Sequence, residues 1–147
     1  MRGSRRGSRE LALQGLYQWL VNQTDADDML EQIRNMDGFG KADRAYLELL
    51  VRGVVNNADA LRESIRPFLD RSTDNLSPVE QALLLMAACE LETQPGTPYR
   101  VVINEAVELA KSYGGTDGHK YVNGVLDKLA AKVRPDEIAA RKKGRVR

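Results

Sequence analysis

The pattern of apolar and polar positions is clearest between residues 98 and 130, where two periodic segments flank a glycine-rich turn. On a helical wheel, the first segment has a narrow polar stripe, formed by Asn104, Glu105, Glu108, Lys111 and Ser112. Its other side is apolar, formed by Val102, Ile103, Ala106, Val107, Leu109, Ala110 and Tyr113. The second segment has an apolar half, formed by Tyr121, Val122, Val125, Leu126, Leu129, Ala130 and Val133. Together they predict a helical hairpin at the centre of a packed bundle.

Apolar periodicity predicts further helices on the N-terminal side of this hairpin. Ser8 is positioned to cap the first helix. A short amphipathic helix follows within residues 24–36. A longer helical pattern covers about residues 41–68, with Gly53 and the Asn56–Asn57 pair as candidate breaks.

Ser77, Pro78 and Glu80 form the clearest local signal, a capping box with proline at the first helical position. The helix that they open is broadly apolar and includes Cys89, which we interpret as a small core residue. Pro135 is expected to end the last helix, and the basic tail after it has the composition of a disordered segment. No segment alternates with period two. The sequence therefore predicts an all-α fold, a compact bundle of six or seven helices.

The net charge of +1 hides an uneven distribution. Residues 1–9 carry four arginines and no acid, residues 134–147 carry a net +4, and the residues between them carry a net −7. Basic ends on an acidic body are typical of proteins that bind a polyanion such as nucleic acid. Solubilising tails have the same composition, so the charge pattern alone leaves both interpretations open.

Length and residue usage favour a cytoplasmic protein with one domain, or two small subdomains that share a core. A chain of 147 residues can bury a sufficient core without disulfides, and its single cysteine cannot form an internal one. We find neither a signal peptide nor an apolar run long enough to span a membrane.

Candidate catalytic chemistry is sparse. The loop at residues 114–120 does not match a P-loop, because its spacing is short and Tyr121 replaces the required Ser or Thr. His119 is the only histidine and Cys89 the only cysteine, so we expect no zinc site, no other metal, no cofactor and no catalytic residue. The start of the last helix, with His119 and Lys120, is nonetheless a natural phosphate-facing site.

Two long motifs are more specific than any short signature: PYRVVINEAVELAK at residues 98–111 and HKYVNGVLDK at residues 119–128. They are accompanied by the arginine-rich lead, by LYQW at residues 16–19 and by SPVE at residues 77–80. In this combination the chain resembles the NusB family of bacterial transcription antitermination factors over nearly its full length.

The resemblance implies an all-helical fold of two three-helix bundles. It also implies binding to boxA-type single-stranded RNA together with NusE, a small-subunit ribosomal protein. The assembled complex would modify RNA polymerase so that transcription of rRNA operons resists premature termination. Some members of the family form homodimers that hide the RNA-binding surface.

Residues that match the family's motifs carry the implied binding surfaces. The RNA surface would be formed by Arg5, Arg6, Arg9, Tyr17, Asp117, Lys120 and Tyr121. The basic side chains would neutralise four phosphates, and the tyrosine rings would stack on unpaired bases. Glu80 corresponds to a position on the NusE side, in addition to its helix-capping role.

A single NusB-like domain is expected to span the chain. Its parts would be a basic lead at residues 1–7, sub-bundles at 8–72 and 76–133, and the basic tail at 134–147. Two alternatives remain at this point. One is the NusB-like domain of an rRNA cytosine methyltransferase, although glycine-rich cofactor motifs are not found in this sequence. The other is a helical scaffold that binds only proteins.

Overall fold

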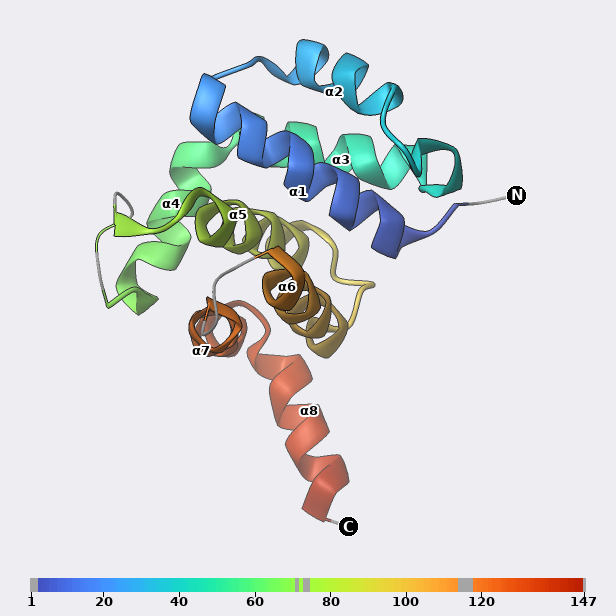
Figure 1. The fold of residues 1–147 in the computed structure, drawn as a ribbon. Coiled ribbons are helices and arrows are strands. Elements are labelled where there is room, and N and C mark those ends of the chain that lie inside the picture. The colour runs from blue at the N-terminus through green and yellow to red at the C-terminus, as the bar shows by residue number, and fades with distance from the viewer. Residues whose placement is uncertain (1–2, 71, 73–74, 114–117, 147) are drawn as a thin grey trace.

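A computed structural model describes residues 3–70, 72, 75–113 and 118–146 of the chain, and within these ranges the fold is entirely helical (Figure 1). Its α-helices are α1 (Arg5–Asn22), α2 (Ala26–Arg34), α3 (Arg44–Asn56), α4 (Ala58–Ile65), α5 (Pro78–Thr93), α6 (Tyr99–Tyr113), α7 (Gly118–Val133) and α8 (Pro135–Val146). Two 3₁₀ helices, η1 (Phe39–Lys41) and η2 (Arg66–Phe68), lie between them. The all-α prediction is confirmed, whereas the predicted count of six or seven helices is wrong, because the described residues form eight α-helices.

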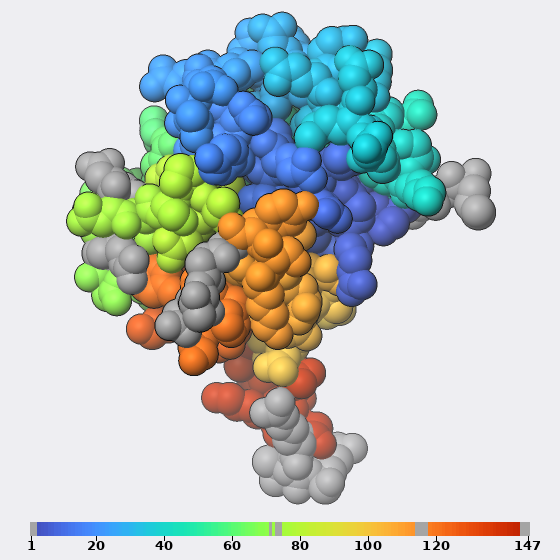
Figure 2. Space-filling model, in the orientation of Figure 1, coloured from blue at the N-terminus to red at the C-terminus, as the bar shows by residue number. Residues whose placement is uncertain are grey.

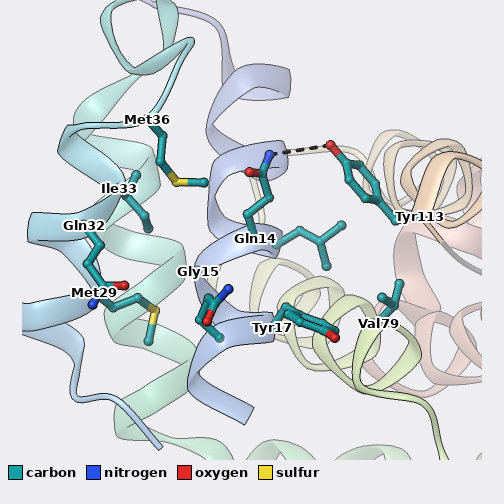
Figure 3. Close-up of a pocket in the computed structure, with 11 residues that line it drawn as sticks. Gln14, Gly15, Tyr17, Met29, Gln32, Ile33, Met36, Val79 and Tyr113 are labelled. Carbon is teal, nitrogen blue, oxygen red and sulfur yellow. Dashed lines mark hydrogen bonds between the residues drawn. The ribbon is translucent and has the colours of Figure 1, made fainter. Parts of the chain in front are cut away.

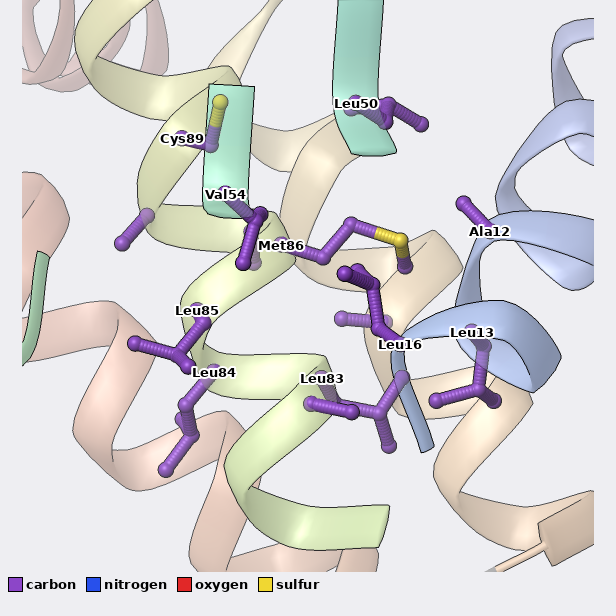
Figure 4. Close-up of a cluster of buried hydrophobic side chains, with 14 of the residues drawn as sticks. Ala12, Leu13, Leu16, Leu50, Val54, Leu83, Leu84, Leu85, Met86 and Cys89 are labelled. Carbon is purple, nitrogen blue, oxygen red and sulfur yellow. The ribbon is translucent and has the colours of Figure 1, made fainter. Parts of the chain in front are cut away.

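The core is organised around α5 and not around the α6–α7 hairpin that the sequence pattern placed at the centre. Every residue of α5 from position 82 to 91 is buried. Leu83 faces α1, whereas Leu84 and Leu85 point toward other neighbours (Figure 4). The helix contacts α1, α3, α4, α6 and α7. An all-round apolar helix can lie only where other helices cover each of its faces, which explains its central position.

Helix contacts fall into two groups that share α5 as a neighbour. Helices α1, α2 and α3 contact one another, and α5, α6 and α7 contact one another. The α6–α7 pair is closely packed, as the two periodic patterns predicted. The long segment at residues 41–68 is broken at Asn57, whose side-chain amide donates to the Gly53 carbonyl at 2.9 Å.

The first helix begins earlier than the sequence suggested. Ser4 caps α1 by accepting from the Gly7 N–H at 3.1 Å, so the prediction that Ser8 is the cap is wrong. The reason is tertiary: Ser4 forms an isolated β-bridge with Ala42, which fixes the chain just before the helix. Ser8 is buried, and its hydroxyl donates to the Asp43 carbonyl at 2.6 Å. Arg5 and Arg6 are therefore helical residues and not part of an irregular lead.

The C-terminal segment also differs from expectation. Pro135 does end α7, but it then occupies the first position of α8, where its missing N–H costs nothing. Asp136 and Glu137 in the first turn suit the positive end of the helix dipole. A helix therefore replaces the expected tail. None of the helices in the described ranges is long and apolar enough to cross a membrane.

Candidate nucleic-acid interface

The seam between α1 and α6 brings together residues from the two most distinctive parts of the sequence. Arg6 forms a bidentate pair with Glu105, with its Nε 3.1 Å from Oε2 and its Nη2 2.9 Å from Oε1. Farther along, the Tyr113 hydroxyl donates to a Glu10 carboxylate oxygen at 2.7 Å. These contacts require α1 and α6 to run parallel, and the two helices lie side by side on one face of the molecule (Figure 2).

Arg5 and Arg6, two residues of the expected RNA surface, are both exposed. The Arg6 side chain is 74% exposed despite its ion pair. Its pKa is raised by the hydrogen bonds and then by the charge of Glu105. The Arg5 guanidinium lies 4.4 Å from the centroid of the Tyr46 ring and donates to the Thr97 hydroxyl at 3.3 Å. Both remain cations that can reach a phosphate.

Arg9 must be removed from the expected RNA surface. It is only 4% exposed, and its guanidinium makes a bidentate contact to the buried carboxylate of Glu90, with Nε 3.0 Å from both oxygens and Nη2 2.8 Å from Oε1. The Tyr46 hydroxyl donates to the same carboxylate. A phosphate could reach Arg9 only by opening the core, so this residue joins α1 to α5 and does not face a ligand.

The pKa values of Arg9 and Tyr46 are both raised in their network with Glu90. Burial alone would lower the pKa of Arg9, but the hydrogen bonds and charge of Glu90 outweigh it and raise that pKa. Burial, followed by the hydrogen bond to Glu90, raises the pKa of Tyr46 to about 12. Arg9 therefore stays charged, and Tyr46 stays a neutral phenol, across the neutral pH range.

Tyr17 lines a groove of about 650 Å³ between α1, α2 and the ends of α5 and α6 (Figure 3). Its side chain is 38% exposed and lies near Val79 (Figure 3). Met29 and Met36 lie on the opposite wall. A partly exposed tyrosine in an apolar groove can offer a ring face to an unstacked base.

Tyr113 also lines this groove and was missed as a candidate. The wheel assigned it to the apolar side of its helix, but its side chain is 41% exposed. The hydrogen bond to Glu10, followed by burial, raises the pKa of its hydroxyl. Gln14 also donates to that hydroxyl at 3.5 Å. The only signal in the sequence was its place at the last turn before the glycines.

The first turn of α7 forms a second, separate part of the candidate surface. Lys120 is exposed, and the half-buried Tyr121 accepts a hydrogen bond from the Asp70 N–H at 3.3 Å. The seam runs about 12 Å along α6, from Glu105, which pairs with Arg6, to Tyr113 at the end of the helix. Because α7 begins shortly after α6 ends, its first turn lies at the Tyr113 end of the seam. Asp117, also expected at this surface, lies outside the described residues.

The predicted capping box at the start of α5 is confirmed. Ser77 accepts from the Glu80 N–H at 3.1 Å, and Glu80 accepts from the Ser77 N–H at 3.0 Å. Glu80 is half-buried and adjoins Val79 of the groove wall. Cys89 is buried, as expected for a core residue, and burial raises the pKa of its thiol.

Comparison with known proteins settles the family. The sequence model of the NusB family matches residues 6–131. The chain belongs to the NusB family. It is 56% identical, over 95% of its length and 97% of the relative's, to the transcription antitermination protein NusB of Paraburkholderia phymatum.

Solved structures of the NusB family have the same fold. NusB of T. maritima aligns with a TM-score of 0.84 at 29% identity, covering 95% of this chain and 99% of the other. A crystal structure of antitermination factors NusB and NusE in complex with dsRNA aligns with a TM-score of 0.70 at 27% identity, covering 85% of this chain and 94% of the other.

Proposed function

We propose that this protein binds boxA-type single-stranded RNA together with NusE, and that the assembly helps RNA polymerase in the cytoplasm to resist termination in rRNA operons. The observation that carries the proposal is the α1–α6 face. There α1 presents the exposed Arg5 and Arg6 and the partly exposed Tyr17. Relatives named as antitermination proteins, and a NusB–NusE complex that contains RNA, support it.

Each retained residue has a defined part in this proposal. Arg5, Arg6 and Lys120 neutralise phosphates, while Tyr17 and Tyr121 stack on bases. Asp117 remains a proposed base contact on the strength of the family resemblance alone. Because Arg9 is buried against Glu90, we assign it no phosphate, so the expected phosphate contacts number three and not four.

Fluorescence anisotropy with labelled boxA RNA, measured with and without NusE, tests the proposal. Three phosphate contacts to a single strand predict a slope of about −2 when log affinity is plotted against log salt. NusE should increase the affinity. An absence of binding at low salt, with no enhancement by NusE, would contradict the proposal.

The Arg6–Glu105 pair allows a sharper test. Arg6→Gln should weaken binding and reduce the magnitude of the salt slope by about 0.7. Glu105→Gln should tighten binding, because it removes a carboxylate beside the phosphate path and releases Arg6. Arg52→Gln is the matched control, since Arg52 is a partly exposed arginine that pairs with Asp27 and Glu48 on the α2–α3 side. Equal effects of Arg6→Gln and Arg52→Gln would remove Arg6 from the interface.

Glu80 is proposed to contact NusE. Because glutamine also completes a capping box, Glu80→Gln removes the charge while preserving the helix start. Reduced affinity for NusE with unchanged thermal stability is expected. Unchanged NusE affinity would place Glu80 outside the interface. A homodimer that hides the RNA surface would appear in light scattering as a larger species that RNA dissociates.

The two alternative functions make different predictions. The curated relatives that match over 97–99% of their own length are antitermination proteins, which disfavours the methyltransferase hypothesis. A scaffold that binds only proteins would bind NusE without any measurable affinity for RNA in the same anisotropy experiment.

A further inference from the structure

Helix α8 is a basic arm outside the segment that the family model matches. It projects away from the rest of the molecule (Figure 1). Beyond Ile138, which packs against the core, its described side chains are exposed. Arg141, Lys142 and Lys143 make no ion pair within the described part of the chain. Residues 141–147 contain five basic residues and no acid.

The base of α8 is fixed by a buried arginine. Arg134 donates to three backbone carbonyls at the end of α5 and in the following loop, those of Leu91 at 2.8 Å, Gln94 at 2.9 Å and Thr97 at 3.1 Å. It also pairs with Glu137 at 2.5 Å. The other oxygen of Glu137 accepts from the Tyr99 N–H at 2.8 Å, at the first residue of α6. These contacts give the arm a defined direction from the body.

Thr97 connects this base to the N-terminal arginines. Its carbonyl accepts from Arg134, and its hydroxyl accepts from Arg5. The basic beginning of α1 and the residue that precedes the basic α8, which are far apart in the sequence, therefore contact the same loop. An RNA strand that continued from the seam past Arg5 would reach the loop that holds the base of α8.

We propose that α8 is a second RNA-binding element, which holds the backbone of nucleotides flanking the segment bound at the α1–α6 seam. This inference rests on the proposed function of that seam. The helix is about 18 Å long. Its three exposed cations, Arg141, Lys142 and Lys143, could neutralise about three phosphates of a single strand. It contains no aromatic residue, so it neutralises phosphates without reading bases.

The composition of α8 favours RNA over a membrane surface as the partner. A helix that binds a lipid interface needs an apolar face opposite its basic one. Between residues 135 and 144 of α8 the only large apolar side chain is Ile138, and it packs against the core. Arg5 of α1 and Arg134 at the base of α8 both contact Thr97. This shared contact favours the RNA bound at the seam as the partner of α8.

The test compares two RNAs: the boxA segment alone, and the same segment extended at either end by about eight uridines, enough to reach along the helix. The variant is the triple substitution Arg141→Gln, Lys142→Gln, Lys143→Gln. Its matched control is Arg34→Gln, Arg44→Gln, Arg52→Gln, which removes the same charge from α2 and α3. Circular dichroism checks that both variants keep the helical content of the parent protein.

For the parent protein, one extension should steepen the salt slope by about 2 and tighten binding up to about a hundredfold at 0.1 M salt. The α8 variant should lose that gain and still bind the short RNA, whereas the control variant should keep it. If neither extension steepens the slope, or if the α8 variant retains the gain, the inference is overturned while binding of the short RNA preserves the proposed function. If the parent protein binds neither RNA, both fail.

Discussion

Breaking the Arg9–Glu90 pair should destabilise the protein strongly without changing its phosphate contacts. Both side chains are almost completely buried, and four hydrogen bonds converge on the Glu90 carboxylate, three from Arg9 and one from Tyr46. Removal of one partner leaves an uncompensated charge in the core, which typically costs about 3–5 kcal/mol. For a domain of this size that loss lowers the melting temperature by roughly 10–15 °C.

A double-mutant cycle measures this coupling. Arg9→Met and Glu90→Leu should each cost about 3–5 kcal/mol in chemical denaturation, whereas the double variant should cost less than either single variant, because no buried charge remains. Arg9→Met, assayed well below its melting temperature, should retain the parent salt slope for RNA. Single-variant costs below about 1 kcal/mol, or a flatter salt slope for Arg9→Met, would refute the structural role of Arg9.

Three further predictions concern the scaffold. A Cβ on Gly53 would lie 2.7 Å from the Cys89 sulfur, so Gly53→Ala should destabilise the protein by about 1 kcal/mol. In a Cys89→Ala background the same substitution should stabilise it by up to about 1 kcal/mol, because the clash is gone and alanine favours the helix. Thermal unfolding measures both effects, and the same sign in both backgrounds would contradict the packing argument. The folded-state pKa of Tyr46, about 12, exceeds its unfolded value of about 10, so the stability that it contributes is complete below pH 10 and is lost as the pH rises toward 12. Denaturation across that range should show a smaller pH dependence for Tyr46→Phe, and identical profiles would refute this. Ser77→Ala should cost about 1 kcal/mol through loss of the helix cap, and a neutral result would contradict the capping role.

Local signals were the most predictable from the sequence. The capping box before α5 depends on residues three apart, so its geometry follows from short-range chemistry. The α6–α7 pair was predictable because strong periodicity and a short connection bring such helices together. Tertiary hydrogen bonds were not: the Ser4–Ala42 bridge, which extends α1 backward, joins residues that no local pattern relates.

The misassignment of Arg9 has a physical explanation. In composition it belongs with Arg5 and Arg6, but in helical phase it belongs with Ala12, Leu13 and Leu16, all of which are buried. With Ser8 as the expected cap, Arg9 would be the first residue of the helix, whereas with Ser4 as the cap it lies in the second turn, on the buried face. Its partner Glu90 was equally hidden, as the only charged residue within the buried stretch of α5.

The candidate surface was predicted in part. Arg6 and Tyr17 are exposed on α1 as expected, because an amphipathic helix displays its edge residues. The part played by Tyr113 depends on the parallel packing of α6 against α1, and the convergence of two basic segments at Thr97 depends on how α8 docks. Neither packing arrangement is encoded in a local pattern.

The central claim is that RNA binds the α1–α6 face and the first turn of α7. Photo-crosslinking of boxA RNA to the protein in the presence of NusE tests it most directly, because mass spectrometry locates the modified residues. The account predicts crosslinks at Tyr17 and Tyr121, on the α1–α6 face and the first turn of α7. Crosslinks confined to the α2–α3 side, or none at either tyrosine in a complex that demonstrably contains RNA, would contradict it.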